Sequence, residues 1–117
     1  MQPVEATPFD REEMLERLGG DTVLLDDVLG VFLEECPKMF EEVRGAVDAG
    51  DPRKVHRAAH SMRGALLNIS AGPAAAEAKQ LELLGSEDRL AEGAPVLERL
   101  RRAVERLQQA LAEQTAG

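Results

Sequence analysis

Apolar residues recur three or four positions apart along most of the chain, and this period predicts α-helices. Proline and glycine divide the pattern into five segments, which are expected to form helices over residues 9–18, 22–49, 52–69, 73–84 and 95–112. No segment alternates apolar and polar residues over the length of a strand. The expected fold is therefore all-α, an antiparallel four-helix bundle with a short additional N-terminal helix.

The boundaries of the long second and third helices carry clear signals. Asp21 is expected to cap the second helix and Gly50 to end it. Asp51 and Pro52 then supply an N-cap and a residue suited to the first position of the third helix. Pro37 lies inside the second helix, where it is expected to kink or interrupt the backbone.

Each long helix has an apolar stripe that is expected to face the core. The stripe of the second helix contains Leu24, Leu25, Val28, Leu29, Val31, Phe32, Met39, Phe40, Val43 and Val47. The stripe of the third helix contains Val55, Ala58, Met62, Ala65, Leu66 and Ile69. The stripe of the last helix contains Val96, Leu97, Leu100, Val104, Leu107 and Leu111. Cys36 is expected to be a small core residue.

The length of 117 residues suits one domain, and no linker-like segment divides it. We expect an N-terminal tail over residues 1–8, the bundle over 9–112 with a loop at 85–93, and a fraying C-terminal tail over 113–117. The single cysteine excludes an intrachain disulfide and a thiolate-clustered zinc site. Because neither a signal peptide nor a membrane-spanning run is apparent, the protein is expected to be cytoplasmic, without a membrane partner.

The chain is acidic, with 22 Asp and Glu residues against 14 Lys and Arg residues and a formal net charge of −8. This charge opposes non-specific binding to nucleic acids and to anionic lipids. The third helix departs from this acidic balance, because it contains four cations within eleven residues, Arg53, Lys54, Arg57 and Arg63. The acidic pairs at 34–35 and 41–42 are expected to form a solvated face.

His60 lies opposite the core face of the third helix and is expected to meet solvent. An exposed imidazole in its neutral form is a nucleophile that can attack phosphorus. Arg63, one turn further along, is placed to stabilise a phosphoryl group during transfer. Gly64 disfavours a helix by about 1 kcal/mol relative to alanine, and a small residue there would let a partner approach His60 closely.

Spacing alone leaves a second interpretation open, in which His60 is an ordinary surface histidine among salt-bridged arginines and Gly64 serves helix packing. His56 and His60 also have the i, i+4 spacing of a pair of metal ligands. That pair lacks the glutamate of a His-Glu-x-x-His site, and the flanking arginines would repel a dication. We therefore expect no metal and a solvated His56 beside the site.

Residues 59–69, AHSMRGALLNI, resemble the signature of histidine-containing phosphotransfer (HPt) domains of two-component phosphorelays. That family's pattern is roughly A-H-x-L-K-G, followed by a hydrophobic residue and a small-residue turn. Further matches at the family's spacings are Ala71, Ala78, Leu81, Glu82 and the segments LGGD at 18–21, FLEECP at 32–37 and AGD at 49–51. The resemblance covers nearly the whole chain.

Carried over by position, the resemblance implies that His60 accepts the phosphoryl group, that Arg63 assists it and that Gly64 leaves access. Glu82 falls where a glutamine or glutamate of the next helix often approaches the histidine ring. The departures from the pattern are arginine for the commoner lysine at Arg63, serine for glycine at Ser70 and alanine for leucine at Ala74. The last two are expected to alter the joint between the third and fourth helices.

The implied function is reversible carriage of a phosphoryl group on His60 between aspartates of response-regulator receiver domains, in a relay with a sensor or hybrid histidine kinase. The receiver would supply magnesium, and no cofactor is expected on this chain. No ATP-binding motif is present, so autonomous kinase activity is not expected. The docking face of this monomer would include Arg53, His56, Arg57 and Leu67.

A second function class remains open at this stage. It is a helical adaptor that binds a signalling partner by shape alone and whose His60 is never phosphorylated. The combination of His60, Arg63 and Gly64 favours the carrier. The sequence does not identify the cognate kinase and receiver, the direction of phosphate flow, the output, or whether the bundle belongs to a larger kinase.

Overall fold

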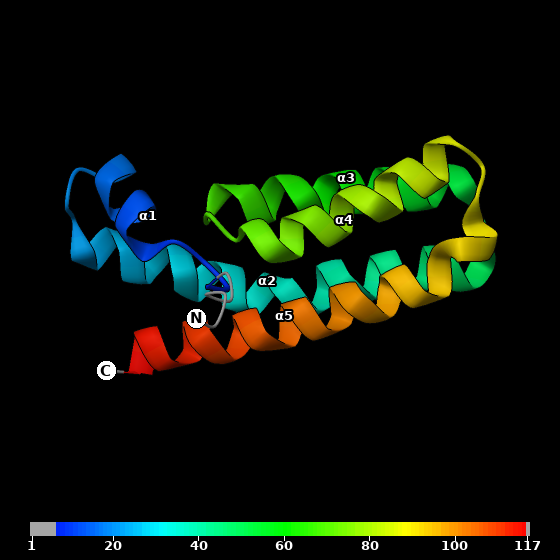
Figure 1. Cartoon of the computed structure of the whole chain (residues 1–117). Helices are drawn as coiled ribbons and strands as arrows, with labels where there is room; N and C mark the ends of the chain where they lie inside the picture. The colour runs from blue at the N-terminus through cyan, green and yellow to red at the C-terminus, as the bar shows by residue number, and fades with distance from the viewer. Residues whose placement is uncertain (1–6, 117) are drawn as a thin grey trace, which may run out of the picture.

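The computed structural model describes residues 7–116, and this range is almost entirely helical (Figure 1). The helices are α1 (Arg11–Arg17), α2 (Thr22–Ala49), α3 (Pro52–Asn68), α4 (Gly72–Ser86), the short 3-10 helix η1 (Leu90–Glu92) and α5 (Gly93–Ala116). No strand occurs in the described range, and the predicted all-α class is confirmed. None of these helices is both long and apolar enough to cross a membrane.

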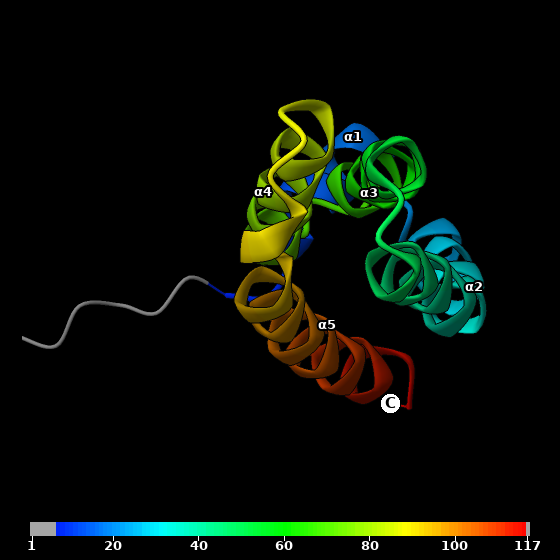
Figure 2. The ribbon, with the colours of Figure 1, turned by 90° about the vertical axis from the view of Figure 1, so that its right-hand side faces the viewer.

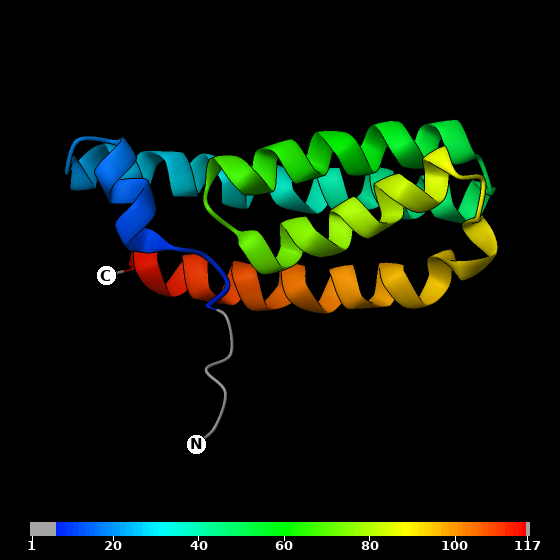
Figure 3. The same cartoon turned by 45° about the horizontal axis from the view of Figure 1, so that its top comes forward.

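The four long helices form an antiparallel bundle. In Figure 1, α3 and α4 lie above α2 and α5, and the end-on view in Figure 2 shows the four helices around a common centre. Both α2 and α4 pack against α3 and against α5. The short α1 lies across one end of the bundle, beside the start of α2 (Figure 3). This is the predicted bundle with an additional N-terminal helix.

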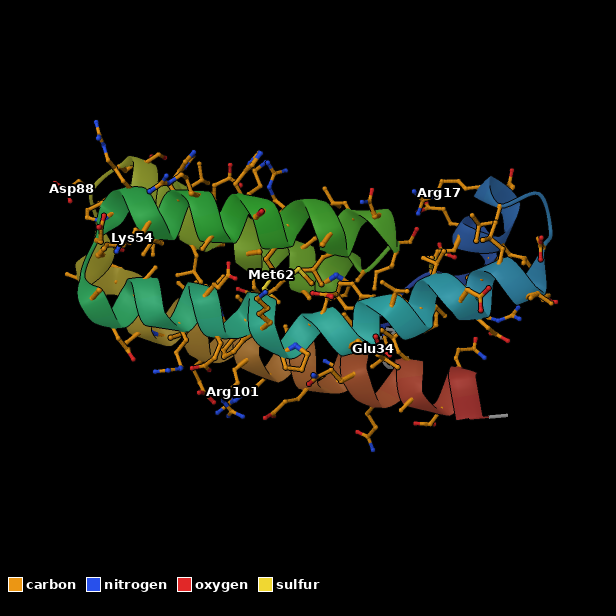
Figure 4. The ribbon with its side chains drawn as sticks, turned by 180° about the vertical axis from the view of Figure 1, so that it is seen from behind. Arg17, Glu34, Lys54, Met62, Asp88 and Arg101 are labelled. Carbon is orange, nitrogen blue, oxygen red and sulfur yellow. The ribbon has the colours of Figure 1, made fainter. Side chains whose placement is uncertain are left out.

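The core between the helices is largely aliphatic. Fully buried side chains include Leu25, Leu29 and Cys36 from α2, Val55, Ala59, Met62 and Leu66 from α3, Leu81 from α4, and Leu100, Leu107 and Leu111 from α5. Figure 4 shows Met62 between α3 and α2. The expected core position of Cys36 is confirmed. Burial raises the pKa of its thiol to about 11, so this thiol stays protonated and unreactive at neutral pH.

Two residues of the predicted α2 stripe do not face the core. Leu24 and Val31 are 42% and 61% exposed, although each directly precedes a buried residue, Leu25 and Phe32. One residue turns a helix by about 100°, so Leu24 and Val31 lie on the flank of α2 and cannot reach the core. Their expected burial is wrong. On α3, conversely, Ala59 is fully buried although the predicted stripe omitted it.

Several helix boundaries differ from the prediction. Helix α1 begins at Arg11, after Phe9, because Asp10 Oδ1 caps it by accepting a hydrogen bond from Glu13 N at 3.0 Å. Helix α4 extends through Ser86, and η1 occupies part of the loop expected at 85–93. Helix α5 runs on over 113–116, where a fraying tail was expected. Residues 1–6 of the expected N-terminal tail and residue 117 lie outside the described residues.

Helix α2 is continuous through Pro37. A proline inside a helix lacks the N–H that would bond to the carbonyl four residues earlier. Buried residues on both sides of it, Cys36 before and Val43 after, hold the two halves of α2 against the same core. Of the two outcomes expected at Pro37, a kink or a break, the break does not occur.

Ser70 forms the joint between α3 and α4. Its φ of 56° lies in the left-handed region that favours glycine. The Ser70 hydroxyl lies 2.6 Å from Arg17 Nη2 and donates to Glu13, while the Ser70 carbonyl accepts a hydrogen bond from Asp10 N at 2.9 Å. These contacts fasten α1 to the joint, and they offset the cost of this backbone conformation in a serine.

Helices α3 and α4 approach each other closely at Gly85. A Cβ atom added to Gly85 would lie 2.7 Å from both His56 N and Pro52 O, which are backbone atoms of α3. No larger residue fits there without moving one of the two helices. The prediction of a loop over residues 85–93 did not include this packing position. The close packing of α4 on α3 at Gly85 places Glu82, one turn earlier on α4, beside the middle of α3.

Candidate functional site

His60 lies near the middle of α3 and points away from the core. The helix begins at Pro52, and Asp51 Oδ1 caps it by accepting a hydrogen bond from Lys54 N at 3.2 Å. Ala59 and Met62 occupy the buried face of the same helix, and the His60 side chain is 62% exposed. The expected exposure of His60 is confirmed.

Glu82 of α4 lies against the His60 ring. Glu82 Oε2 is 2.9 Å from His60 Nδ1, and Glu82 Oε1 is 2.7 Å from Arg63 Nε. The Glu82 side chain is only 13% exposed and that of Arg63 only 27%. The ring contact expected of Glu82 is present. Arg63 is more enclosed than its place on the outer face of α3 suggested, because it folds back onto Glu82.

Arg63 and His60 keep Glu82 ionised. Burial is the largest single influence on Glu82 and favours its neutral form, but the hydrogen bonds from Arg63 and His60 and their charges together outweigh burial. The net effect lowers the pKa of Glu82 below its ordinary value. Glu82 is therefore a carboxylate at neutral pH.

This carboxylate decides which nitrogen of His60 carries the proton. A carboxylate oxygen only accepts hydrogen bonds, so Nδ1 must donate across the 2.9 Å contact. Arg63 Nη2 is 3.4 Å from the same Nδ1, and that longer contact would require Nδ1 to accept. The shorter, charge-assisted bond to Glu82 is the stronger one. It leaves the lone pair of His60 on Nε2, on the edge of the ring away from Glu82.

His56 lies one turn before His60 and is half-buried, so its expected solvation is wrong. Its Nδ1 is 3.3 Å from the backbone carbonyl oxygen of Glu82, which accepts the hydrogen bond. The rings of His56 and His60 stack, with centroids 6.2 Å apart and an angle of 15° between their planes. The His60 ring therefore rests over the turn of α3 that carries His56.

The side chains of the described range do not assemble a metal site. No group of three or more His, Cys, Asp or Glu residues there is placed to hold a metal ion. The two imidazoles at i, i+4 both direct Nδ1 toward Glu82, one to its carboxylate and one to its backbone carbonyl.

Gly64, one turn after His60, is exposed and has open space above it. A Cβ atom added to Gly64 would meet no atom of another residue within 4 Å, apart from its own helix backbone and its chain neighbours. The interpretation that Gly64 serves helix packing is therefore wrong, and Gly85 is the glycine that does so. The open space at Gly64 adjoins the outer side of His60.

The remaining residues expected to bind a partner share the exposed face of α3 with His60. Arg53 and Arg57 lie toward the start of the helix and Leu67 toward its end, and all three are exposed. Within residues 7–116, no carboxylate lies within ion-pair distance of Arg53, Lys54 or Arg57. An open hollow of about 480 Å³ beside them is lined by Arg53, His56, Arg57, Gly85 and Ser86.

Two features of the site escaped the sequence analysis. The sequence contains one signal for the packing of Gly85 against α3, because this glycine directly follows the apolar stripe of α4 that ends at Leu84. The pairing of Arg63 with Glu82 has none, because the two residues are 19 positions apart on different helices and no spacing rule links them.

Comparisons with known proteins identify the family and the fold of the chain. The family model of the Hpt domain matches residues 27–110. The crystal structure of histidine-containing phosphotransfer protein B (HptB) from Pseudomonas aeruginosa PAO1 superposes with a TM-score of 0.87 over 96% of this chain and 97% of that chain. The two sequences are 19% identical, so this likeness shows the fold. No curated protein matches the chain.

The matched range includes α3 with His60 and α4 with Glu82. The family match also agrees with the resemblance carried by residues 59–69, and nothing in the comparisons supports the adaptor. The chain belongs to the Hpt family and is a phosphoryl-carrying intermediate of phosphorelays.

Proposed function

We propose that His60 is the residue that carries the phosphoryl group and that Nε2 is the atom that bonds to phosphorus. The observation that supports this most directly is the 2.9 Å contact between His60 Nδ1 and Glu82 Oε2. It holds the proton on Nδ1 and leaves Nε2 as a nucleophile on an exposed ring.

The transfer from a receiver is a displacement at phosphorus. A bond forms between His60 Nε2 and phosphorus, the bond from phosphorus to the aspartate oxygen breaks, and its electron pair stays on the aspartate carboxylate. The imidazole then bears a positive charge, since Nδ1 keeps its proton. Glu82 stabilises that charge, as a preplaced carboxylate does for an imidazolium. The reverse displacement returns the phosphoryl group to an aspartate.

The other site residues support this step. Arg63 neutralises Glu82 and holds it against the ring, so that the carboxylate keeps its position when His60 is phosphorylated. Gly64 leaves open space through which a partner's aspartate reaches Nε2. Arg53, His56, Arg57 and Leu67 form the surrounding docking face.

Hpt proteins work with histidine kinases and response regulators, and we propose that this chain exchanges its phosphoryl group with receiver domains of such partners in the cytoplasm, as a monomer. The receiver supplies magnesium and the acyl phosphate. The chain has no ATP-binding motif, so we expect no phosphorylation from ATP without a kinase.

A transfer assay with two histidine variants tests the assignment. The parent chain, His60→Gln and His56→Gln are each incubated with a panel of radiolabelled phosphorylated receivers. We expect His60→Gln to accept no label and to melt near the parent temperature, because the replaced side chain is exposed. His56→Gln should still accept label. Label retained by a folded His60→Gln variant would contradict the proposal.

A further inference from the structure

Arg63 is bound to Glu82 on the Nδ1 side of the His60 ring, and this position does not favour its contact with a phosphoryl group on Nε2. Arg63 Nε donates to Glu82 Oε1 at 2.7 Å, and its Nη2 lies 3.4 Å from His60 Nδ1. Both atoms are therefore on the Nδ1 edge of the imidazole. The phosphoryl group on Nε2 would stand on the other edge, away from Arg63, which would have to leave a carboxylate partner to reach it.

Arg57 has the opposite properties. It lies three residues before His60, a spacing that places the two side chains on neighbouring parts of one helix face. Side chains on a helix lean toward its N-terminus, so the His60 ring extends over the turn that carries Arg57. The stacking of the His60 ring on His56 shows that it does lie over this turn.

Arg57 is also free to move onto a phosphoryl group. Its side chain is exposed, and within the described residues it has no carboxylate partner. It lines two open hollows, one of about 480 Å³ toward α4 and one of about 530 Å³ toward α2. Arg53 lines the first hollow, and Lys54 lines the second together with Glu42. The two neighbouring cations outnumber this one carboxylate and favour Arg57 turning toward an anion.

We propose that Arg57 binds the oxygens of the phosphoryl group on His60 Nε2, and that Arg63 acts through Glu82 as a positioning residue. This inference rests on the proposed function, because it requires His60 to be the acceptor. The guanidinium of Arg57 donates hydrogen bonds to the phosphoryl oxygens as Nε2 bonds to phosphorus and the leaving oxygen departs with its electron pair. No proton leaves the ring during the step.

The test uses the full chain with phosphoramidate as the phosphoryl donor, whose P–N bond breaks with loss of ammonia. The variants are Arg57→Gln, Arg63→Gln and, as a matched control, Arg102→Gln. Arg102 is an exposed arginine of α5. Helix α5 lies on the side of the bundle opposite α3 (Figure 1). The first readout is the ³¹P NMR titration of phosphorylated His60, because a bound cation lowers the pH at which the phosphoryl group gains a proton. The second is the rate of phosphorylation of His60.

We expect the phosphoryl group of Arg57→Gln to gain its proton at higher pH than in the parent and in Arg102→Gln. Phosphorylation should slow by about tenfold, the loss expected for one charge-assisted hydrogen bond. Arg63→Gln should displace the ³¹P titration less, but it should change the ¹⁵N shifts of the unphosphorylated His60 ring, because Glu82 loses its partner.

The two proposals fail in distinguishable ways. If the parent is phosphorylated on His60 and Arg57→Gln titrates and reacts like Arg102→Gln, the role of Arg57 is refuted and His60 remains the acceptor. A larger ³¹P displacement in Arg63→Gln than in Arg57→Gln would likewise assign the phosphoryl contact to Arg63. If neither phosphoramidate nor a phosphorylated receiver labels His60 in the parent, the proposed function itself is wrong.

Discussion

Replacing Gly64 by glutamine separates access to His60 from stability. Gly64 is exposed, and a side chain built there would meet no other part of the protein within 4 Å. Glutamine is a better helix former than glycine by about 0.6 kcal/mol. With an unfolding entropy of about 2.1 cal/mol/K per residue, a gain of this size raises the melting temperature of a chain this long by about 2 °C.

The same substitution should slow phosphotransfer. A side chain at position 64 leans toward the N-terminus of α3, and His60 is the residue one turn away in that direction. To admit a receiver's aspartate, the glutamine must be confined away from the ring, and restricting such a side chain costs up to about 2 kcal/mol. We therefore expect transfer between a receiver and His60 to fall by roughly tenfold to thirtyfold.

Thermal melts and transfer rates per folded molecule measure the two effects, with Gly64→Ala as the control. Alanine supplies the gain in helix propensity without a long side chain, so it should raise the melting temperature and slow transfer much less. Transfer by Gly64→Gln at the parent rate would refute the access argument. A lower melting temperature for both variants would show that Gly64 packs against something after all.

Two further predictions concern α4. Gly85→Ala should lower the free energy of unfolding by about 1–3 kcal/mol, because its Cβ atom would lie 2.7 Å from backbone atoms of α3. The control is Gly45→Ala, at an exposed helical glycine with open space, which should be neutral or stabilising. Equal denaturation curves for these two variants would contradict the close approach of α3 and α4 at Gly85. Because the pKa of Glu82 is lower in the folded chain than its ordinary value of 4.5, its ion pairs add stability above that pH and lose it as the pH falls through the folded pKa. Glu82→Gln should therefore be less stable than the parent at pH 7, and the difference measured by urea denaturation should shrink below pH 4.5; a constant difference across this range would refute the assignment.

The helices that build the site were predictable because their signals are local. Asp51 and Pro52 are adjacent in the sequence and define the start of α3. The apolar spacing of α3 alone places His60 on the exposed face. The exposure of Leu24 and Val31 was not predicted, because it depends on the neighbouring helices. A periodic stripe tells which side of α2 is apolar, but the neighbouring helices decide how wide a stripe they cover.

The features that were missed depend on contacts between helices. Gly85 is required by the backbone of α3 at His56 and Pro52, and nothing near Gly85 in the sequence specifies that neighbour. The pairing of Arg63 with Glu82 likewise follows from the packing of α3 on α4. The family resemblance indicated that Glu82 approaches the ring. Only the geometry shows that the same carboxylate also binds the arginine expected to serve the phosphoryl group.

The central claim is that His60 carries the phosphoryl group on Nε2 because Glu82 holds the proton on Nδ1. Two-dimensional ¹H–¹⁵N NMR of the imidazoles, recorded on the parent chain after phosphorylation by a receiver, tests it directly. The account predicts a phosphorus-bonded Nε2 and a protonated Nδ1 on His60, with His56 unmodified. Phosphorus on His60 Nδ1, or on His56, would contradict it.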